Sequence, residues 1–465
     1  MSSPVARGAI VAARWIGSPA GPSVHAVPSL LRVHRDFRLL WAGDTVSAVG
    51  DAVTFVAFPL VALETLGAST ATAALLSGVP SVPMLVLGLP IGAWVDRLPR
   101  RPMFVASTMA AGAAVASVPL AAVLGVLSMA QLVLVALVMG TAQVVSQTAA
   151  GALLPEVVPR DRLVEANGAL QVSGSAAQIG GPSLGGLLVQ VLGAAGALVA
   201  DAISFVLAGL VVLAVRSRSA VRVRESRRRG SLWREIALGL RHVLADPVLR
   251  VLMVNAAIAN LALSAVFALL VPFLSRTVGL APGLLGLLLG IGTGGGLVGA
   301  ALAGRLARRL GTARLVLRSV LLAAPFGLLM PLAAPGWRLA SFVAGLFVVC
   351  VGLGLYNVTV VSYRQAATPP ELLGRVTSAM RVVQQGVMPL GALMAAGLTL
   401  ALGARGALAV SVAIDLIPGL VLLASPVRRL RELPVPDDDR GLVLEKQVPP
   451  AGGASKLPTM HEPTS

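Results

Sequence analysis

The chain has 465 residues, of which 56% are hydrophobic and 12% are charged, and its formal net charge is +17. A soluble domain carries about 25% charged residues, so this composition excludes a water-soluble globular enzyme. The positive charge is almost entirely arginine, because Lys446 and Lys456 are the only lysines. A basic chain often has a polyanionic partner. Here the arginines flank apolar runs, so we expect a role in membrane topology and no nucleic-acid partner.

The apolar runs reach 20 residues or more, which is enough to cross roughly 30 Å of hydrocarbon. They are apolar on every side, and they therefore predict an all-α membrane protein. We expect twelve transmembrane helices, at residues 37–63, 70–95, 102–124, 127–154, 167–192, 195–216, 248–274, 283–306, 312–334, 337–362, 375–402 and 405–425.

Six spans lie on each side of a basic segment, which predicts five regions in the chain. Residues 1–36 and 426–465 have the composition of disordered cytoplasmic tails. Residues 37–216 and 248–425 form an N-terminal and a C-terminal six-helix half. Residues 217–247 link the two halves.

The end of the linker carries an apolar pattern of its own. Leu232, Ile236, Leu240 and Val243 recur at helical spacing. This pattern predicts an amphipathic helix that lies either along the membrane surface or against the cytoplasmic loops.

The loop arginines predict the orientation, since cytoplasmic loops collect positive charge. With the N-terminus inside, eleven loop arginines face the cytoplasm and three face the opposite side. We therefore expect a multi-pass protein of the cell membrane with both termini in the cytoplasm. The eleven are Arg97, Arg100, Arg101, Arg160, Arg162, Arg305, Arg308, Arg309, Arg314, Arg364 and Arg375, and the three are Arg276, Arg338 and Arg405.

The two halves repeat each other in sequence. Residues 96–101 (DRLPRR) follow the second span, and residues 304–309 (GRLARR) follow the eighth, 208 positions later. Pro182 in the fifth span and Pro389 in the eleventh are 207 positions apart. Two six-span halves related by a parallel repeat and joined by a long loop resemble the major facilitator superfamily. The resemblance implies two pseudo-symmetric six-helix bundles.

The loop after the second span carries this resemblance directly. Gly92, Asp96, Arg97, Arg100 and Arg101 match the superfamily's signature, G-x-x-x-D-R-x-x-R-R. The resemblance implies a conformational latch that holds the two halves together on the cytoplasmic side. The alternative is a plain basic loop. The second copy has glycine in place of the acid, which predicts a weaker latch there.

The fifth span resembles the antiporter motif of the superfamily's drug exporters, G-x8-G-x3-G-P-x2-G-G. The matching residues are Gly168, Gly181, Pro182, Gly185 and Gly186, and an alanine replaces one glycine. The resemblance implies export, although small residues at this spacing also serve generic helix packing. Further segments, among them 37–41, 201–205 and 370–375, are similar to the twelve-span macrolide and siderophore exporters. The arginine motif of proton-coupled drug antiporters is missing from the fourth span, so proton coupling would use other groups.

Charged residues inside the spans are few, and each costs roughly 2.5–3.5 kcal/mol on insertion scales. They are Asp44, Asp51, Asp201, Asp415 and Arg381. Asp44, Asp51 and Thr54 share one helical face, and Asp51 lies about 20 Å into the membrane at 1.5 Å per residue. Asp201 and Asp415 belong to spans that are peripheral in this fold, where we expect structural partners.

We place proton coupling at Asp51, because a carboxylate at that depth can take up and release a proton if both openings reach it in turn. Asp44 is the second candidate, and Arg381 is the candidate counter-charge. The alternative is that Asp51 only hydrogen-bonds a neighbouring helix. Further polar residues could contact substrate or join helices; they are Gln143, Gln147, Asn255, Asn357, Gln384 and Gln385.

No catalytic group, cofactor or metal site is predicted, since the chain lacks a P-loop and its four histidines lie in the tails or the linker. The sequence predicts a monomeric secondary active exporter of amphipathic small molecules, such as drugs, macrolides, siderophores or other secondary metabolites. It would work by alternating access, with proton antiport. The alternatives are an importer or a facilitator of the same fold, and less favourably a membrane-embedded enzyme or receptor.

Overall fold

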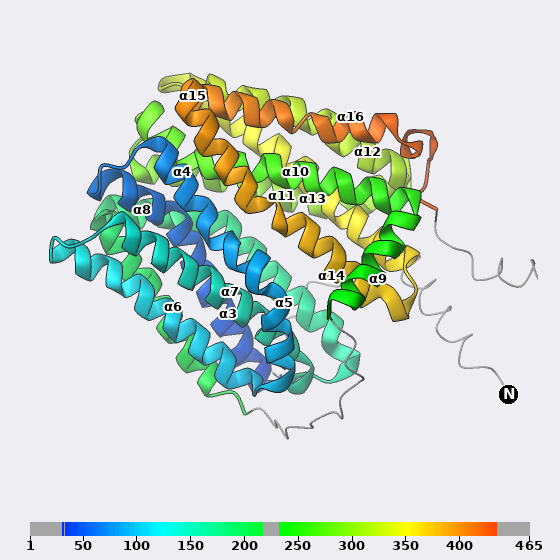
Figure 1. Ribbon diagram of the computed structural model, residues 1–465, viewed down its shortest axis with the longest axis horizontal. Coiled ribbons are helices and arrows are strands. Elements are labelled where there is room, and N and C mark those ends of the chain that lie inside the picture. The colour runs from blue at the N-terminus through cyan, green and yellow to red at the C-terminus, as the bar shows by residue number, and fades with distance from the viewer. Residues whose placement is uncertain (1–29, 32, 217–231, 435–465) are drawn as a thin grey trace, which may run out of the picture.

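The computed structural model describes residues 30–31, 33–216 and 232–434, and only the backbone is described for residues 89–90, 92–97, 160, 232–236 and 370–371. Most of the predicted tails and residues 217–231 of the linker lie outside the described residues. The described chain is helical throughout and contains no strand. Its helices form two bundles, one coloured blue to cyan-green and one green to orange (Figure 1). We call residues 35–213 the N-half and residues 247–429 the C-half.

The N-half contains the first six membrane-crossing segments. The first segment ends in a π-helical turn and the second is interrupted by a 3-10 turn. The elements are α3 (Arg35–Leu60) with η1 (Val61–Thr65), α4 (Thr70–Gly78) with η2 (Val79–Ser81) and α5 (Val82–Arg97), α6 (Arg100–Val123), α7 (Met129–Val157), η3 (Arg160–Arg162) and α8 (Leu163–Leu213).

The C-half repeats this order after α9 (Leu232–Ala245), which packs against α14 and α10. Asp246 caps the start of α10, because its carboxylate accepts from the N–H groups of Val248 and Leu249 at 2.8 and 2.9 Å. The elements are α10 (Pro247–Pro272) with η4 (Phe273–Thr277), α11 (Pro282–Leu310), α12 (Thr312–Ala323) with η5 (Ala324–Leu332), η6 (Gly336–Arg338) with α13 (Leu339–Ala367), α14 (Pro370–Gly386), α15 (Met388–Ile414), α16 (Ile417–Ala424) and η7 (Pro426–Arg429).

Ten helical segments of the described chain are long and apolar enough to cross a membrane, and two of these have 51 and 53 residues. Each of the two reverses at a glycine, Gly193 with φ 75° and Gly403 with φ 70°. Positive φ is favourable only for glycine, so the residue type permits the turn. Both reversals fall between predicted spans. The predicted all-α membrane fold is confirmed, and the described helices agree with twelve spans.

Prolines explain why several predicted spans are not continuous α-helices. A proline supplies no N–H and crowds the preceding turn. Pro80 accompanies the 3-10 turn between α4 and α5, Pro389 follows the break between α14 and α15, and Pro418 follows the break between α15 and α16. Pro182 lies inside α8 without interrupting it.

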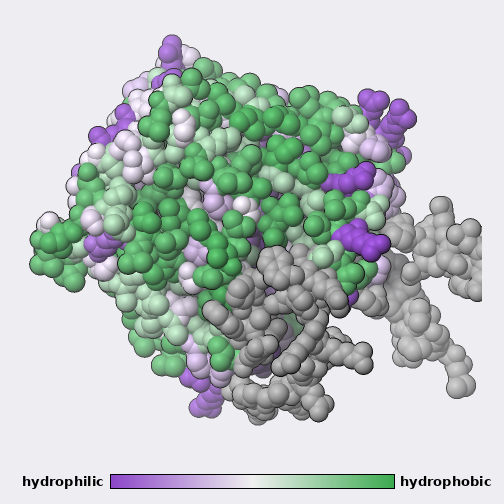
Figure 2. Space-filling model, in the orientation of Figure 1, coloured by the Kyte–Doolittle hydropathy of each residue, from purple (hydrophilic) through white to green (hydrophobic). Residues whose placement is uncertain are grey.

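The outer surface is apolar over most of the visible face, and hydrophilic residues gather toward its edges (Figure 2). On α8 alone, Leu187, Val191, Ile203 and Leu210 are each more than half exposed. Exposed apolar area of this extent is not tolerated in water, so these faces contact lipid.

The two halves share a hydrophobic core at one end of the molecule only. One cluster of buried side chains includes Val61 and Leu63 of the N-half and Leu270 and Phe273 of the C-half. At the other end, separate clusters belong to one half each: one surrounds Phe37 and another surrounds Tyr363. We call the end with the shared core the closed end and the opposite one the split end.

Candidate functional site

The polar face predicted on the first span lies along α3. Asp44, Ser47 and Asp51 are half-buried, whereas Thr54, one turn further toward the closed end, is buried. The side chain of Gln143 on α7 lies close to the carboxylate of Asp51. Asp51, the first candidate for proton coupling, therefore lies beside Gln143, a candidate substrate contact.

Asp201 lies directly behind this face. It is 1% exposed, and its carboxylate accepts hydrogen bonds from the hydroxyl of Thr54 and, at 3.1 Å, from that of Ser204. A Cβ at Gly50 would clash with the side chains of Asp201 and Ser204. Glycine at position 50 therefore allows α8 to present a carboxylate against α3. Asp201 has the structural partners predicted for it, although the sequence did not indicate which they are.

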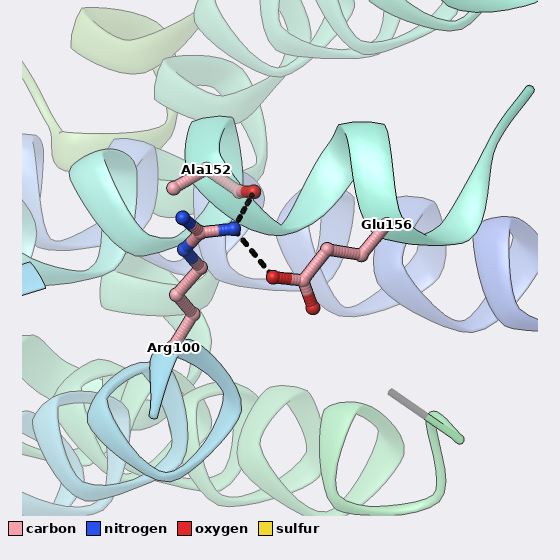
Figure 3. A network of polar contacts seen from close by, with 3 residues as sticks. All are labelled: Arg100, Ala152 and Glu156. Carbon is pink, nitrogen blue, oxygen red and sulfur yellow. Dashed lines mark hydrogen bonds and ion pairs between the residues drawn. The ribbon is translucent and has the colours of Figure 1, made fainter. Parts of the chain in front are cut away.

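The signature loop joins α5, which ends at Arg97, to α6, which begins at Arg100. Arg100 forms an ion pair with Glu156 and donates to the carbonyl of Ala152 at 3.1 Å (Figure 3). Arg101 donates to the carbonyl of Leu213. Both arginines thus tie α6 to other helices of the N-half, and among the described residues neither contacts the C-half.

The side chains of Gly92, Asp96 and Arg97 lie outside the described part of the chain. The predicted latch between the halves therefore stays a prediction.

The glycines of the antiporter motif place α8 between α3 and α11. A Cβ at Gly185 would lie 2.9 Å from the Cα of Val53, and one at Gly181 would clash with Ala52. On the other side, a Cβ at Gly186 would lie 2.8 Å from the Cα of Gly286. Gly168 differs, since nothing lies within 4 Å of its Cβ position. Three of the four motif glycines thus take part in close packing, and the contact at Gly186 joins the two halves.

Further contacts between the halves cluster at the closed end. Arg276 of η4 donates to the carbonyl of Leu63 in η1. The side chain of Gln190 accepts from the N–H of Gly283 at 3.0 Å. The rings of Phe55 and Phe267 meet edge to face, with centroids 6.4 Å apart. Asp51 lies one turn from Phe55, on the split side of this closure.

The remaining candidate residues differ in their exposure and in their hydrogen-bond partners. Arg381 is exposed on α14 and donates to Gln385 of the same helix at 3.3 Å, and no ion pair joins it to Asp51 in the described chain. Asn255 is 1% exposed and donates to the hydroxyl of Tyr356 at 3.0 Å. Gln147 and Asn357 are exposed, and Gln384 is half-buried.

The sequence did not indicate the interhelical pairs of Asp201 with Thr54 and of Asn255 with Tyr356. The only local signal was the spacing of Asp201 and Ser204 by three residues.

Two bundles of six membrane-crossing segments that share a core at one end are the architecture of a two-domain transporter. Residues 40–392 match the family model of the Major Facilitator Superfamily. The chain belongs to this superfamily, and so to a family of transporters.

The relatives found by sequence are efflux pumps. The chain is 34% identical over 227 residues to the multidrug efflux pump Tap of Mycobacterium tuberculosis and Mycobacterium bovis, a match that covers 46% of this chain and 52% of the pump. It is 30% identical over 221 residues to Tap of Mycolicibacterium fortuitum, covering 46% and 54%. The match therefore spans about half the length of these relatives.

Solved structures with the same fold differ widely in cargo. A bacterial homologue of the lysosomal transporter Spinster, inward-facing and occupied, has a TM-score of 0.69 at 15% identity, covering 84% of this chain and 96% of that one. An inward-facing bacterial homologue of the iron transporter ferroportin has a TM-score of 0.67 at 19% identity, covering 84% and 98%. The nucleoside transporter NupG has a TM-score of 0.70 at 10% identity, covering 84% and 99%.

Proposed function

We propose that this chain is a secondary active exporter of amphipathic small molecules that works by alternating access. The observation that carries the proposal is the asymmetric packing of the halves, which share one core at the closed end and have separate cores at the split end. A carrier with two such halves can expose a central site to one side at a time. The polar face of α3 lies on the split side of the closure, where a substrate that enters between the halves would meet it.

Drug-like cargo is supported by the relation to the Tap pumps and by the antiporter-motif glycines. These glycines let α8 approach both α3 and α11 closely. The loop arginines support cytoplasmic termini. With that orientation the split end is cytoplasmic, and the structure corresponds to the inward-open state. Residues 37–216 and 248–425 would then move as two bodies connected by the linker.

Proton antiport is proposed to run through Asp51. This residue is half-buried on α3, contacts Gln143, and has a neighbouring carboxylate at Asp201 that is already satisfied by two hydroxyl donors. Asp44, on the same face but nearer the split end, is the second candidate.

Asp51→Asn in proteoliposomes with an imposed pH gradient tests the coupling. We expect gradient-driven transport to fall at least about tenfold, as loss of an essential coupling group requires, while substrate counterflow continues. Asp51→Glu, which keeps a titratable group, should retain part of the gradient response. Gradient-driven transport by Asp51→Asn at the wild-type rate would remove Asp51 from the mechanism.

The direction of transport is tested separately, because importers and facilitators share this fold. A lipophilic cationic drug is offered to inverted vesicles that contain the protein and maintain a pH gradient. Export predicts accumulation inside such vesicles, driven by protons leaving them. Accumulation only in right-side-out vesicles would establish the importer alternative.

A further inference from the structure

The carboxylate of Asp415 is the one intramembrane acid of the C-half, and its surroundings differ from those of Asp201. It lies between α15 and α16 and lines a cavity of about 50 Å³ together with residues of α10, α12 and α13. No hydrogen-bond donor reaches the carboxylate among the described residues, and no lysine, arginine or histidine of the described chain lines the cavity. All its lining residues belong to the C-half, so the cavity is distinct from the α3 face that carries Asp51.

Most of the donors of the other polar groups at this cavity are already engaged, and one N–H of Asn255 is left over. The side-chain N–H of Asn255 donates to Tyr356 at 3.0 Å, and the hydroxyl of Tyr356 donates to the carbonyl of Leu252 at 3.4 Å. The hydroxyl of Ser319 donates to the carbonyl of Val316 at 2.9 Å.

What remains at the cavity is one N–H of Asn255 and a larger set of oxygen acceptors. The Oδ1 atom of Asn255, in a side chain that is 1% exposed, has no partner in the described structure. Buried acceptors of this kind are normally satisfied. The carboxylate of Asp415, the hydroxyl oxygen of Ser319 and that of Tyr356, which already accepts from Asn255, complete the set. These oxygen acceptors outnumber the one remaining N–H of Asn255, and a site rich in unpartnered oxygens suits a cation.

The break between α15 and α16 also favours a cation at this cavity. α15 ends at Ile414, and Pro418 cannot donate an N–H to the carbonyl four residues before it. The C-terminal end of a helix carries a partial negative charge. Broken helices supply cation-coordinating carbonyls in other transporters.

Size and charge narrow the class of cation. A space of about 50 Å³ holds a few water-sized bodies, since one water needs roughly 10–15 Å³, and it is far too small for a drug. A single carboxylate balances one positive charge, whereas a divalent ion would leave an uncompensated charge in an apolar bundle. We propose that Asp415, Asn255, Ser319 and Tyr356 form a binding site for a small monovalent metal cation. Its occupancy would hold α10, α12 and α13 to the break between α15 and α16.

Sodium is the probe, and the purified full-length protein in detergent is the sample. We expect NaCl, at constant ionic strength against choline chloride, to raise the melting temperature by a few degrees with saturation. Equilibrium dialysis with ²²Na⁺ should show saturable binding to the wild-type protein. Asp415→Asn should abolish both signals. Ser319→Ala, which removes one acceptor with little change in volume, should raise the half-saturating sodium concentration severalfold.

Asp201→Asn is the matched control, because it removes the other intramembrane acid of a peripheral helix, one that already has two donors. This variant should keep the wild-type sodium response. A response lost in Asp201→Asn and kept in Asp415→Asn would overturn the assignment. Absence of saturable ²²Na⁺ binding to the wild-type protein would overturn it as well, whatever the stability of the variants. Neither result would bear on export or on Asp51.

Discussion

Single polar side chains are tolerated in the N-half because other helices supply their partners. Asp201 is buried on α8, and the hydroxyls of Thr54 and Ser204 provide its hydrogen bonds. A buried carboxylate without donors is strongly unfavourable. The hydroxyl of Thr54 therefore stabilises the contact between α3 and α8 directly behind Asp51, while Ser204 supports Asp201 from the same helix, and Gly50 provides the space for the contact.

Thr54→Val tests this contact, because it keeps the shape of the side chain and removes the hydroxyl. We expect a loss of about 1–3 kcal/mol in stability, since a buried acceptor loses one of its donors. The measurement is the melting temperature of the purified protein in detergent.

Thr45→Val is the control on the same helix. The hydroxyl of Thr45 donates to the carbonyl of Trp41 at 2.7 Å, within its own helix, and supports no contact between helices. Equal destabilisation by the two substitutions would show that the pairing of Thr54 with Asp201 has no special role.

At the scale of helices, close approach is concentrated where α8 packs on α3 and on α11. The antiporter-motif glycines at 181, 185 and 186 make this possible, because even a methyl group would meet backbone or Cβ atoms of the neighbouring helix. Small residues allow helices in lipid to approach closely. α8 therefore packs both within the N-half, on α3, and across the interface between the halves, on α11.

Gly186→Ala and Gly168→Ala form a matched pair within this motif. The first adds a methyl group against Gly286 of the other half, and overpacking of this kind costs about 1–3 kcal/mol. We expect slower transport and a lower melting temperature. The second adds a methyl group in open space, where alanine in place of glycine should be neutral or stabilising by up to about 1 kcal/mol. Transport rates and melting temperatures check both, and equal loss in the two variants would contradict a specific role for the contact at Gly186.

At the scale of the whole molecule, the two halves meet in one core at the closed end. The guanidinium of Arg276 reaches the carbonyl of Leu63 in the other half, and Glu64 lies near it. Under the proposed alternating access, the two packings of the halves would differ by a few kcal/mol. Contacts that exist in only one of the two packings determine how much each conformation is populated.

Arg276→Ala should shift the molecule away from this conformation. A hydrogen bond from a charged donor is worth about 1.5–3 kcal/mol, and each 1.4 kcal/mol changes the population ratio about tenfold. With Ser47→Cys as reporter in a Cys350→Ala background, we expect faster labelling by an impermeant maleimide from the closed-end side. Cys350 is buried, and removing it leaves a single reactive thiol.

Arg338→Ala is the control for this effect. Arg338 lies at the same end of the C-half, and its guanidinium lies 5.9 Å from the ring centre of Trp337 without a contact to the N-half. The Arg338→Ala variant of the reporter protein should be labelled at the same rate as the reporter protein without this substitution. An unchanged rate in Arg276→Ala would show that this arginine does not hold the halves together.

Local patterns were sufficient to predict the membrane-crossing segments, the reversals near residues 193 and 403, and the superfamily. Hydropathy decides which stretches enter lipid, and only glycine adopts the turn without strain. The placement of Asp51 on one polar face with Asp44 and Thr54 follows from helical periodicity in the same way.

Local patterns did not determine how each helix is rotated or which helix lies beside it. Asp201 and Thr54 are separated by 147 residues, and Asn255 and Tyr356 by 101. Their meeting depends on how whole helices pack. The tertiary structure alone decided that Asp201 is satisfied, that Asp415 lines a cavity inside the C-half, and that the halves share a core at one end. The physical reason is that apolar helices can bury their faces against several alternative neighbours at similar cost, and steric fit between bundles selects among them.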